Sequence, residues 1–322
     1  MRAVRVPATG GPDALVAADI SAPEPGPGEA LVRVEVAGVN FIDVYHRTGL
    51  YPRSLPFTSG VEGAGVVELV GEGVELLGVG DRVAWALTPG SYAEAAVVPA
   101  ERLVRIPDDL SFELAAAVMV QGLTAHYLVE STFTLGPDHV AVVHAAAGGV
   151  GLLLVQLAKS AGATVIGTCS TEEKARRVLA AGADHVVRYD RTPFQPEVMS
   201  LTGGDGASVV YDSVGRATFR DSLASLRPRG FLVLYGQSSG KVGPFDPADL
   251  ASAGSVYLTR PVLADYARDR RELEWRAGDV FGKVGRGELD VRIQAVLPLE
   301  EAAEAHRLLE GRATSGKLLL RP

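Results

Sequence analysis

A strand, a glycine-rich turn and a helix follow one another between residues 140 and 160, and this succession constrains the fold more than any other feature. The stretch reads VAVVHAAAGGVGLLLVQLAKS. Ala146, Gly148 and Gly151 occupy the three positions of the pattern G-x-G-x-x-G, with alanine in place of the first glycine. In a dinucleotide-binding fold, backbone N–H groups at such a helix start face a pyrophosphate. The stretch therefore predicts a bound dinucleotide.

Two other interpretations of this stretch fit the residues less well. A membrane span needs about 18 or more consecutive apolar residues, and His144, Gln156 and the glycines interrupt the run. A flexible turn in a two-layer protein would not require a second strand and helix directly afterwards. The sequence has this second unit, with a strand predicted over 164–169 and a helix over 171–183.

The chain is long enough for two domains. It has 322 residues, and single hydrophobic cores stop growing at about 250 to 300 residues. Roughly the first hundred residues alternate short apolar runs with dense glycine and proline, for example in the strands predicted over 29–39 and 63–74. This pattern predicts a β-rich, barrel-like module, with one helical turn over 40–49.

The middle of the chain alternates strands with helices. After a helical stretch over 110–132, continuous Val and Leu runs are separated by helical segments of about 10 to 15 residues, which indicates a doubly wound parallel sheet covered on both faces. Among the helices we expect one over 216–230 and one over 265–287. The last elements, from the helix over 265–287 to residue 322, lack a further βαβ repeat, so we expect them to return to the first domain.

Charge and cysteine content exclude several classes of function. The net charge is −8 and the pI is about 5.4, which argues against a large surface for nucleic acid or anionic lipid. The single Cys169 can form neither an intrachain disulfide nor a four-thiolate metal site, so we expect a reducing cytosol. The first residues also lack the apolar run of about 7 to 15 residues of a secretory signal.

The tip of the second strand of the dinucleotide fold selects the cofactor. NAD enzymes place Asp or Glu there, on the ribose 2′-hydroxyl. Here Ser170 and Thr171 occupy this position and Lys174 follows one turn later, so a 2′-phosphate would meet hydroxyl groups and a cation. These residues predict NADPH rather than NADH. The same stretch is also a good helix N-cap, with Glu172 and Glu173 in the first turn, and both interpretations can hold together.

At this point the chain resembles the medium-chain dehydrogenase/reductase superfamily, and more closely its zinc-free NADPH:quinone reductases, the group that includes ζ-crystallin. The segments that carry the resemblance are GVNFIDVYHRTGLYP, EGAGVV, GDRV, HAAAGGVG, VVYDSVG, GQSSG, TRP and RATSGKLLL. The resemblance implies an α/β protein with a GroES-like β-rich catalytic domain at 1–119 and 262–322. It also implies a doubly wound Rossmann domain for NADPH at 120–261, with the cofactor between the two.

Zinc enzymes of this superfamily carry a metal-binding Cys where this chain has Asn40. They carry a G-H-E motif where it has Val61 and Glu62. Catalytic Zn²⁺ needs three N, S or O ligands from the protein, so we expect no metal. Glu62 is then expected to accept a hydrogen bond from the backbone near the turn.

The resemblance also assigns the site residues. Asn40, Tyr45 and Tyr51 would lie on the substrate side, with simple packing as the alternative for the tyrosines. Lys174, Tyr189 and Arg312 would frame the adenosine phosphate. The complete set of cofactor contacts is Phe41, Ile42, Tyr45, Tyr127, Gly148, Gly149, Val150, Gly151, Ser170, Thr171, Lys174, Tyr189, Ser213, Gly236, Gln237, Ser238, Ser239, Pro261, Val262, Leu263 and Arg312.

Two departures from the family pattern bear on the substrate. Gln121 stands where the quinone reductases carry lysine, and the loop WALTPGSYAE is short. Both are expected near the cleft, so they bear on the choice of substrate rather than on the chemistry. His126 and His144 are expected to be packed histidines that are hydrogen-bonded to the backbone, rather than catalytic ones.

The resulting prediction is a cytoplasmic, metal-free NADPH:quinone oxidoreductase that transfers a hydride or electrons to a quinone. Without a Lewis acid, an acceptor that is already electrophilic suits the site. The alternatives are an NADPH-dependent reductase of α,β-unsaturated carbonyls and a ζ-crystallin-like NADPH-binding protein with little turnover. The resemblance further implies a homodimer formed by edge strands, for which the apolar stretch 231–236 is the candidate. We expect no nucleic-acid or membrane partner.

Overall fold

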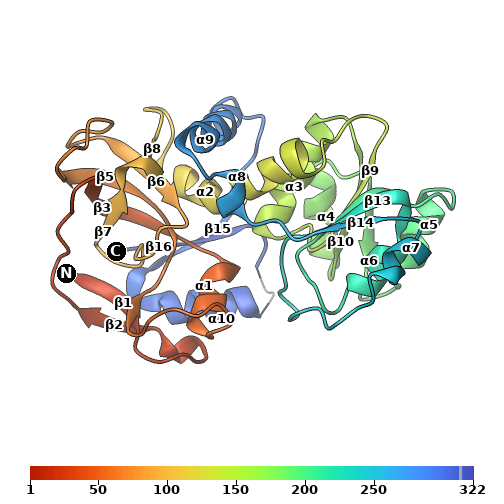
Figure 1. Cartoon of the computed structure of the whole chain (residues 1–322), viewed down its shortest axis with the longest axis horizontal. Helices are drawn as coiled ribbons and strands as arrows, with labels where there is room; N and C mark the ends of the chain where they lie inside the picture. The colour runs from red at the N-terminus through yellow and green to blue at the C-terminus, as the bar shows by residue number, and fades with distance from the viewer. Residues whose placement is uncertain (312–313) are drawn as a thin grey trace. The chain divides into compact units, whose positions relative to one another are not determined.

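The computed structural model describes residues 1–311 and 314–322 (Figure 1). The chain divides into two compact units, and each is described by itself. The first unit comprises Met1–Leu123 and Ala267–Pro322, and the second comprises Thr124–Tyr266.

The second unit is built on a parallel sheet, for which the described residues supply six strands. These are β9 (Val140–Val143), β10 (Thr164–Cys169), β11 (His185–Arg188), β12 (Ala207–Asp212), β13 (Leu226–Leu234) and β14 (Tyr257–Thr259). Their order is β11-β10-β9-β12-β13-β14, which is the doubly wound order 3-2-1-4-5-6. Continuous Val, Ile and Leu runs form these strands because both faces of the sheet are covered.

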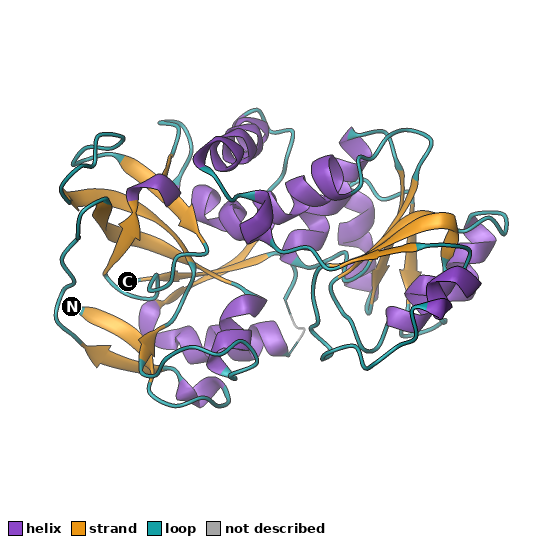
Figure 2. Ribbon diagram, viewed as in Figure 1, coloured by secondary structure: helices purple, strands orange, loops and turns teal. Residues whose placement is uncertain are grey.

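Helices cover both faces of this sheet (Figure 2). The helices of the second unit are α3 (Gly149–Ser160), α4 (Glu172–Ala180), α5 (Phe194–Leu201), α6 (Phe219–Ala224), α7 (Ala248–Ser252) and α8 (Leu263–Tyr266), with a π-helical turn at Leu128–Thr132. Phe194 of α5 and Phe219 of α6 join Val142 and Val210 of the sheet in one buried cluster. The predicted α/β doubly wound fold is thus confirmed.

Three sequence predictions between residues 216 and 287 are wrong. The helix expected over 216–230 is limited to α6, because Pro228, Arg229 at φ 62° and Gly230 lie in strand β13. Strand β14 was not predicted, and it covers β13. The stretch 231–236 is therefore internal, and Tyr257–Thr259 is the edge strand. The helix expected over 265–287 is split into α8 and α9, since the side chain of Asp269 caps a new helix.

The first unit contains two sheets among its described residues. The larger has the order β15-β16-β3-β5-β6-β8, with β7 paired to β3, and the smaller has the order β2-β1-β4. The strands of the larger sheet are β3 (Glu29–Val39), β5 (Glu62–Val70), β6 (Arg82–Ala86), β7 (Ala95–Pro99), β8 (Val104–Arg105), β15 (Ile293–Pro298) and β16 (Lys317–Arg321). Those of the smaller sheet are β1 (Arg2–Val6), β2 (Val16–Asp19) and β4 (Phe57–Thr58).

Helices flank these sheets. They are α1 (Phe41–Arg47), α2 (Phe112–Tyr127), which crosses into the second unit, α9 (Arg270–Gly285) and α10 (Ala302–Glu310), with short 3-10 turns at Pro12–Ala14, Ala100–Arg102 and Leu299–Glu301. The core of the unit includes Trp85 and Tyr92 together with Leu318 and Leu320 of the last strand.

Strand β3 lies between strands that are far away in the sequence. Its partner β16 runs antiparallel, with Leu319 opposite Gly38, and its partner β5 is also antiparallel, with Gly63 opposite Ala37. The starts of β16 and β5 therefore lie on either side of the end of β3. This arrangement brings Lys317 and Glu62 to Asn40, the residue that follows β3.

Helix α2 and its π-helical extension are apolar. Within the described residues, Phe112–Thr132 is the one helix long and apolar enough to cross a membrane by length and composition, and 78% of its apolar window is buried in the protein. One such helix is weak evidence for a membrane span, because the core helices of soluble proteins pass the same test.

Candidate active site

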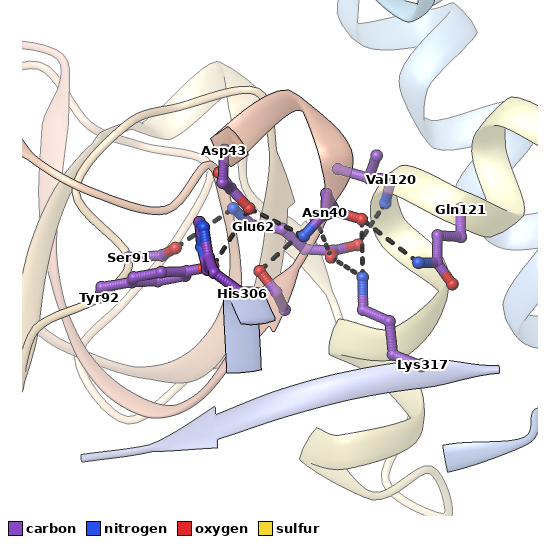
Figure 3. Close-up of polar contacts among 10 residues, drawn as sticks. Asn40, Asp43, Glu62, Ser91, Tyr92, Val120, Gln121, His306 and Lys317 are labelled. Carbon is purple, nitrogen blue, oxygen red and sulfur yellow. Dashed lines mark hydrogen bonds and ion pairs between the residues drawn. The ribbon is translucent and has the colours of Figure 1, made fainter. Parts of the chain in front are cut away.

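Four polar side chains from different elements meet in the first unit, and we call them the carboxamide network (Figure 3). Asn40 lies between β3 and α1, Glu62 begins β5, Gln121 belongs to α2 and Lys317 begins β16. All four are buried, with exposed fractions of 0% for Glu62, 1% for Lys317, 4% for Asn40 and 9% for Gln121. The two amide side chains are therefore the members nearest to solvent.

Hydrogen bonds fix the Asn40 side chain in one orientation. Its Nδ2 donates to Glu62 Oε2 at 2.7 Å, and its Oδ1 accepts from Lys317 Nζ at 2.9 Å and from Gln121 Nε2 at 3.4 Å. An ammonium group can only donate and a carboxylate can only accept. The opposite orientation would therefore place like groups against each other on both sides.

Glu62 is fully engaged as well. Its Oε2 also accepts from Lys317 Nζ, and its Oε1 accepts from the backbone N–H of Val120 in α2. The ion pair lies close above Gly38 of β3, where a Cβ atom would come within 1.9 Å of Glu62 Oε2 and 2.9 Å of Lys317 Nζ. Only glycine leaves room for this contact.

The donor set does not fit a catalytic zinc ion. Position 61 is valine, position 40 is a carboxamide, and both oxygens of Glu62 are bonded to N–H donors. Among residues 1–311 and 314–322, no group of three or more His, Cys, Asp or Glu side chains is placed to hold a metal. The expected backbone bond to Glu62 exists, but its donor lies in α2 rather than at the turn. Sequence reasoning missed the Lys317 ion pair.

A second buried chain of polar groups starts three residues beyond Asn40. Asp43 Oδ2 accepts from the Asn40 N–H at 2.9 Å and from the Tyr92 hydroxyl at 3.2 Å. His306 Nε2 lies 3.2 Å from the same hydroxyl, and its Nδ1 lies 3.1 Å from Arg47. Because arginine can only donate, the His306 proton lies on Nε2.

Burial has the largest effect on the pKa values of Asp43 and His306 in this series of hydrogen bonds. It raises the pKa of Asp43 to about 7, against the opposing effects of the Asn40 N–H and of Lys317. The second carboxylate oxygen, Oδ1, is buried with no hydrogen-bond partner among the described residues. Burial, followed by the charge of Arg47, lowers the pKa of His306 to about 3, so this imidazole is neutral at physiological pH.

The aromatic residues predicted for the site cluster around α1. Phe41 and Tyr45 have ring centroids 6.2 Å apart, and Tyr45 and Tyr51 meet edge to face at 5.2 Å. All three are partly exposed, as is Ile42. The structure thus places Phe41, Ile42, Tyr45 and Tyr51 together in the first unit, beside Asn40.

In the second unit, the glycine turn leads directly into α3. Gly148 is the extended N-cap residue of this helix, and among the described residues no side chain caps it. The first-turn N–H groups of α3 therefore remain available to an anion. Gly151 is required for packing, because a Cβ there would lie 2.4 Å from the carbonyl oxygen of Ala145. Ala145 itself has φ 49°. This local geometry fits the pyrophosphate of a dinucleotide.

Most of the remaining predicted cofactor residues follow the carboxyl ends of the parallel strands, at one edge of the sheet. Ser170, Thr171 and Lys174 follow β10, Tyr189 follows β11, Ser213 follows β12, Gly236, Gln237, Ser238 and Ser239 follow β13, and Pro261, Val262 and Leu263 follow β14. Tyr127 is different: its ring is buried and stacked on Tyr266 at 4.4 Å. Arg312 lies outside the described residues.

The residues at the end of β10 explain how helix N-cap and phosphate site can share one stretch. Thr171 Oγ1 accepts from the backbone N–H of Lys174 at 3.2 Å and caps α4. The glutamates of the first turn are engaged by arginines, Glu172 by Arg188 at 2.8 Å and Glu173 by Arg177. Neither carboxylate is therefore an isolated negative charge at this strand end.

The second unit contains a further set of hydrogen-bonded polar side chains, which we call the strand-end network: His144, Thr168, Asp212, Thr218 and Ser222. All except the partly exposed Thr218 are buried. His144 lies 2.9 Å from Thr168 Oγ1 through Nδ1 and 3.0 Å from Ser222 Oγ through Nε2. Ser222 and Thr218 donate to Asp212 Oδ2 at 3.0 and 2.7 Å. Burial lowers the pKa of His144. His144 is thus a packed histidine, although its partners are side chains rather than backbone.

Comparison with known proteins first defines the class. Residues 26–108 match the family described as alcohol dehydrogenase GroES-like domain, and residues 149–272 match the family described as zinc-binding dehydrogenase. A GroES-like domain combined with a doubly wound sheet defines a medium-chain dehydrogenase/reductase.

Individual relatives narrow this class. The quinone oxidoreductase of Pseudomonas aeruginosa is 44% identical over 99% of both chains, and the 2-haloacrylate reductase of a Burkholderia species is 42% identical over 97% of this chain and 96% of its own. The solved structure of Escherichia coli quinone oxidoreductase complexed with NADPH is similar over the full length of both chains, with a TM-score of 0.98 and 41% identity. The chain therefore belongs to the quinone oxidoreductase family.

Proposed function

We propose that this protein is an NADPH:quinone oxidoreductase that works without a metal ion. The observation that carries the proposal is the carboxamide network: where zinc enzymes of the class place metal ligands, Asn40 and Glu62 are bonded to each other and to Lys317. A site without a Lewis acid favours an acceptor that is electrophilic by itself. The quinone reductases among the relatives act on such a class of acceptor by name.

The second unit is proposed to bind NADPH. The α3 N-terminus would hold the pyrophosphate, and Ser170, Lys174 and Tyr189 would hold the 2′-phosphate at the ends of β10 and β11. When bound, NADPH supplies a hydride. The quinone would accept this hydride and take up one proton from solvent, which balances the reaction to hydroquinone and NADP⁺. The chain itself binds and orients the two reactants.

The first unit is proposed to hold the acceptor, beside Asn40, Tyr45 and Tyr51. The half-buried aromatic pair Tyr45 and Tyr51 offers an apolar surface to a planar ring. We keep the division into a substrate domain at 1–119 and 262–322 and a cofactor domain at 120–261 as part of this proposal.

A cytosolic homodimer completes the proposal. The edge strand β14 exposes Tyr257, whose ring stacks on Phe231 at 4.5 Å, and its unpaired backbone can extend the sheet into a second copy. The buried thiol of Cys169 suits a reducing compartment.

A direct assay tests the proposed reaction. Purified protein is mixed with 1,4-benzoquinone or 9,10-phenanthrenequinone, and oxidation of NADPH or NADH is followed at 340 nm. We expect turnover with NADPH and a lower kcat/KM with NADH. Absence of turnover with both cofactors would exclude the proposal, and tight NADPH binding without turnover would favour a binding protein.

The Lys174→Glu variant tests the cofactor site. Lys174 is proposed to contact a part of NADPH that does not react, so its loss removes uniform binding. We expect the KM for NADPH to rise by at least about tenfold, with kcat at saturating NADPH nearly unchanged. An unchanged KM would remove Lys174 from the site.

Reduction of α,β-unsaturated carbonyls is the second candidate. The full-length similarity to the 2-haloacrylate reductase favours it. A panel of 2-haloacrylates, 2-alkenals and quinones at equal NADPH separates the two candidates by kcat/KM.

A further inference from the structure

The carboxamide network contains an ion pair with no evident structural need. Lys317 and Glu62 are almost completely removed from solvent. Desolvation of two charges usually offsets their attraction, and apolar replacements are often as stable. The network therefore suggests a role for the charges beyond stability of the fold.

The charges determine which way the Asn40 amide faces. Lys317 donates to Asn40 Oδ1, and Glu62 accepts from Nδ2. One N–H of the Asn40 side-chain amide therefore donates to Glu62. The other makes only a 3.5 Å contact with the Gly38 carbonyl oxygen, which is longer than a normal hydrogen bond. This N–H retains most of its capacity to donate.

The ammonium group also strengthens this donor. A hydrogen bond from a cation to an amide oxygen draws electron density toward that oxygen, and hydrogen bonds in such a chain polarise one another. A donor of this kind stabilises the negative charge that develops on a carbonyl oxygen when the acceptor is reduced.

We propose that Lys317 is a positioning residue of the acceptor site, whose buried ammonium group turns the Asn40 amide so that one N–H faces the carbonyl oxygen of the acceptor. Lys317 acts through Asn40 and does not touch the acceptor. The inference rests on the proposed function, because it assumes a carbonyl-bearing acceptor beside Asn40. It names a residue whose contribution sequence reasoning did not reveal.

The double variant Glu62→Gln with Lys317→Met tests the proposal. It removes both charges and leaves a neutral network, so we expect it to fold with a thermal midpoint near that of the wild type. Glutamine at position 62 can donate as well as accept, and methionine at position 317 cannot donate, so the Asn40 amide loses its fixed orientation. We expect kcat/KM for 1,4-benzoquinone to fall by about tenfold to a hundredfold, with an unchanged Kd for NADPH.

Each result of this experiment is informative. A folded double variant with wild-type kcat/KM would overturn the inference, since the ion pair would then serve the fold alone. Wild-type protein without quinone turnover would instead overturn the proposed function. Arg321→Met is the matched control, because it removes a cation from the same strand whose partner, Glu113, lies at the surface. It should leave kcat/KM unchanged.

A mutant cycle tests whether Lys317 acts through Asn40. We expect Asn40→Ala and the triple variant with Glu62→Gln and Lys317→Met to show the same kcat/KM, because the amide to be oriented is absent in both. A further tenfold loss in the triple variant would contradict the inference.

A measurement on the wild type tests the same inference without kinetics. The ¹⁵N-labelled side-chain amide of Asn40, assigned by its loss in Asn40→Ala, should show two separate N–H resonances. A quinone analogue that is not reduced should shift the resonance of the N–H that does not face Glu62. No shift of either resonance at saturation would overturn the inference.

Discussion

Glu62 in the first unit and Asp212 in the second are both fully buried carboxylates, but they are stabilised in different ways. Asp212 accepts from the backbone N–H groups of Val214 and Gly215 at 2.8 and 3.0 Å, and from two hydroxyl groups. All of these donors are neutral. Glu62 accepts from one backbone N–H and one amide, and its remaining donor is the ammonium group of Lys317.

The difference reflects where each carboxylate lies in its element. Asp212 ends a strand, and the turn that follows folds its own N–H groups back onto the side chain. Glu62 begins a strand in the middle of a sheet, where neighbouring backbone groups are already paired. Loss of one of the four neutral donors to Asp212 should therefore lower the free energy of unfolding moderately. Loss of the single cation beside Glu62 should lower it more, because a buried charge is left uncompensated.

Loss of the cation is expected to have the largest effect. In Lys317→Met, Glu62 stays buried without a counter-charge, so the free energy of unfolding should fall by about 3 to 5 kcal/mol. Trp85 and Trp275 both lie in the first unit, so urea unfolding followed by tryptophan fluorescence reports on it. Arg321→Met, which breaks an exposed pair, should cost at most about 1 kcal/mol. Equal effects of the two variants would break the comparison.

The effect expected for Asp43 lies between that for Lys317 and that for the strand-end network. Asp43 is a buried carboxylate whose Oδ1 has no hydrogen-bond partner within the described part of the chain. Its pKa is raised from 3.8 in the unfolded chain to about 7. The native state therefore holds this proton more tightly, and the contribution of Asp43 to stability is complete below about pH 4 and lost as the pH rises to about 7.

Asp43→Asn should remove this pH dependence. The wild type should lose stability relative to the variant by at most about 1.4 kcal/mol per pH unit between these limits. Urea titrations at several pH values measure this difference, and parallel curves for the two proteins would contradict the assignment.

The smallest effect is expected in the strand-end network. Thr218→Val removes one donor to Asp212 and leaves three, so the free energy of unfolding should fall by about 0.5 to 1.5 kcal/mol. Urea unfolding followed by circular dichroism provides the measurement. A loss as large as that of Lys317→Met would show that Asp212 depends on each donor as strongly as Glu62 depends on its cation.

Local patterns predicted the elements whose signal is long and regular. The alternation over 29–39 gave the bounds of β3, and the apolar run with its glycine turn gave β9 and α3. In these cases the signal lies within about ten consecutive residues. Strand β14 was missed because Tyr257–Thr259 is too short for any period to show.

The carboxamide network could be predicted only in part. Asn40 and Glu62 stand out because they occupy positions known from the zinc enzymes. Lys317 is 255 residues away from Glu62 along the chain, and a lysine that begins an apolar strand is normally a solvated strand end. Only the pairing of β16 with β3, which no local pattern encodes, brings it inside.

Gly38 makes the ion pair between Glu62 and Lys317 recognisable in the sequences of related proteins. Because Gly38 has no side chain, the ion pair between Glu62 and Lys317 can lie directly against it. A larger residue at position 38 would collide with both side chains. Related chains that have replaced this glycine should also have replaced the glutamate or the lysine. Gly38, Glu62 and Lys317 thus form a sequence signature. It distinguishes related chains that contain this buried ion pair from those that do not.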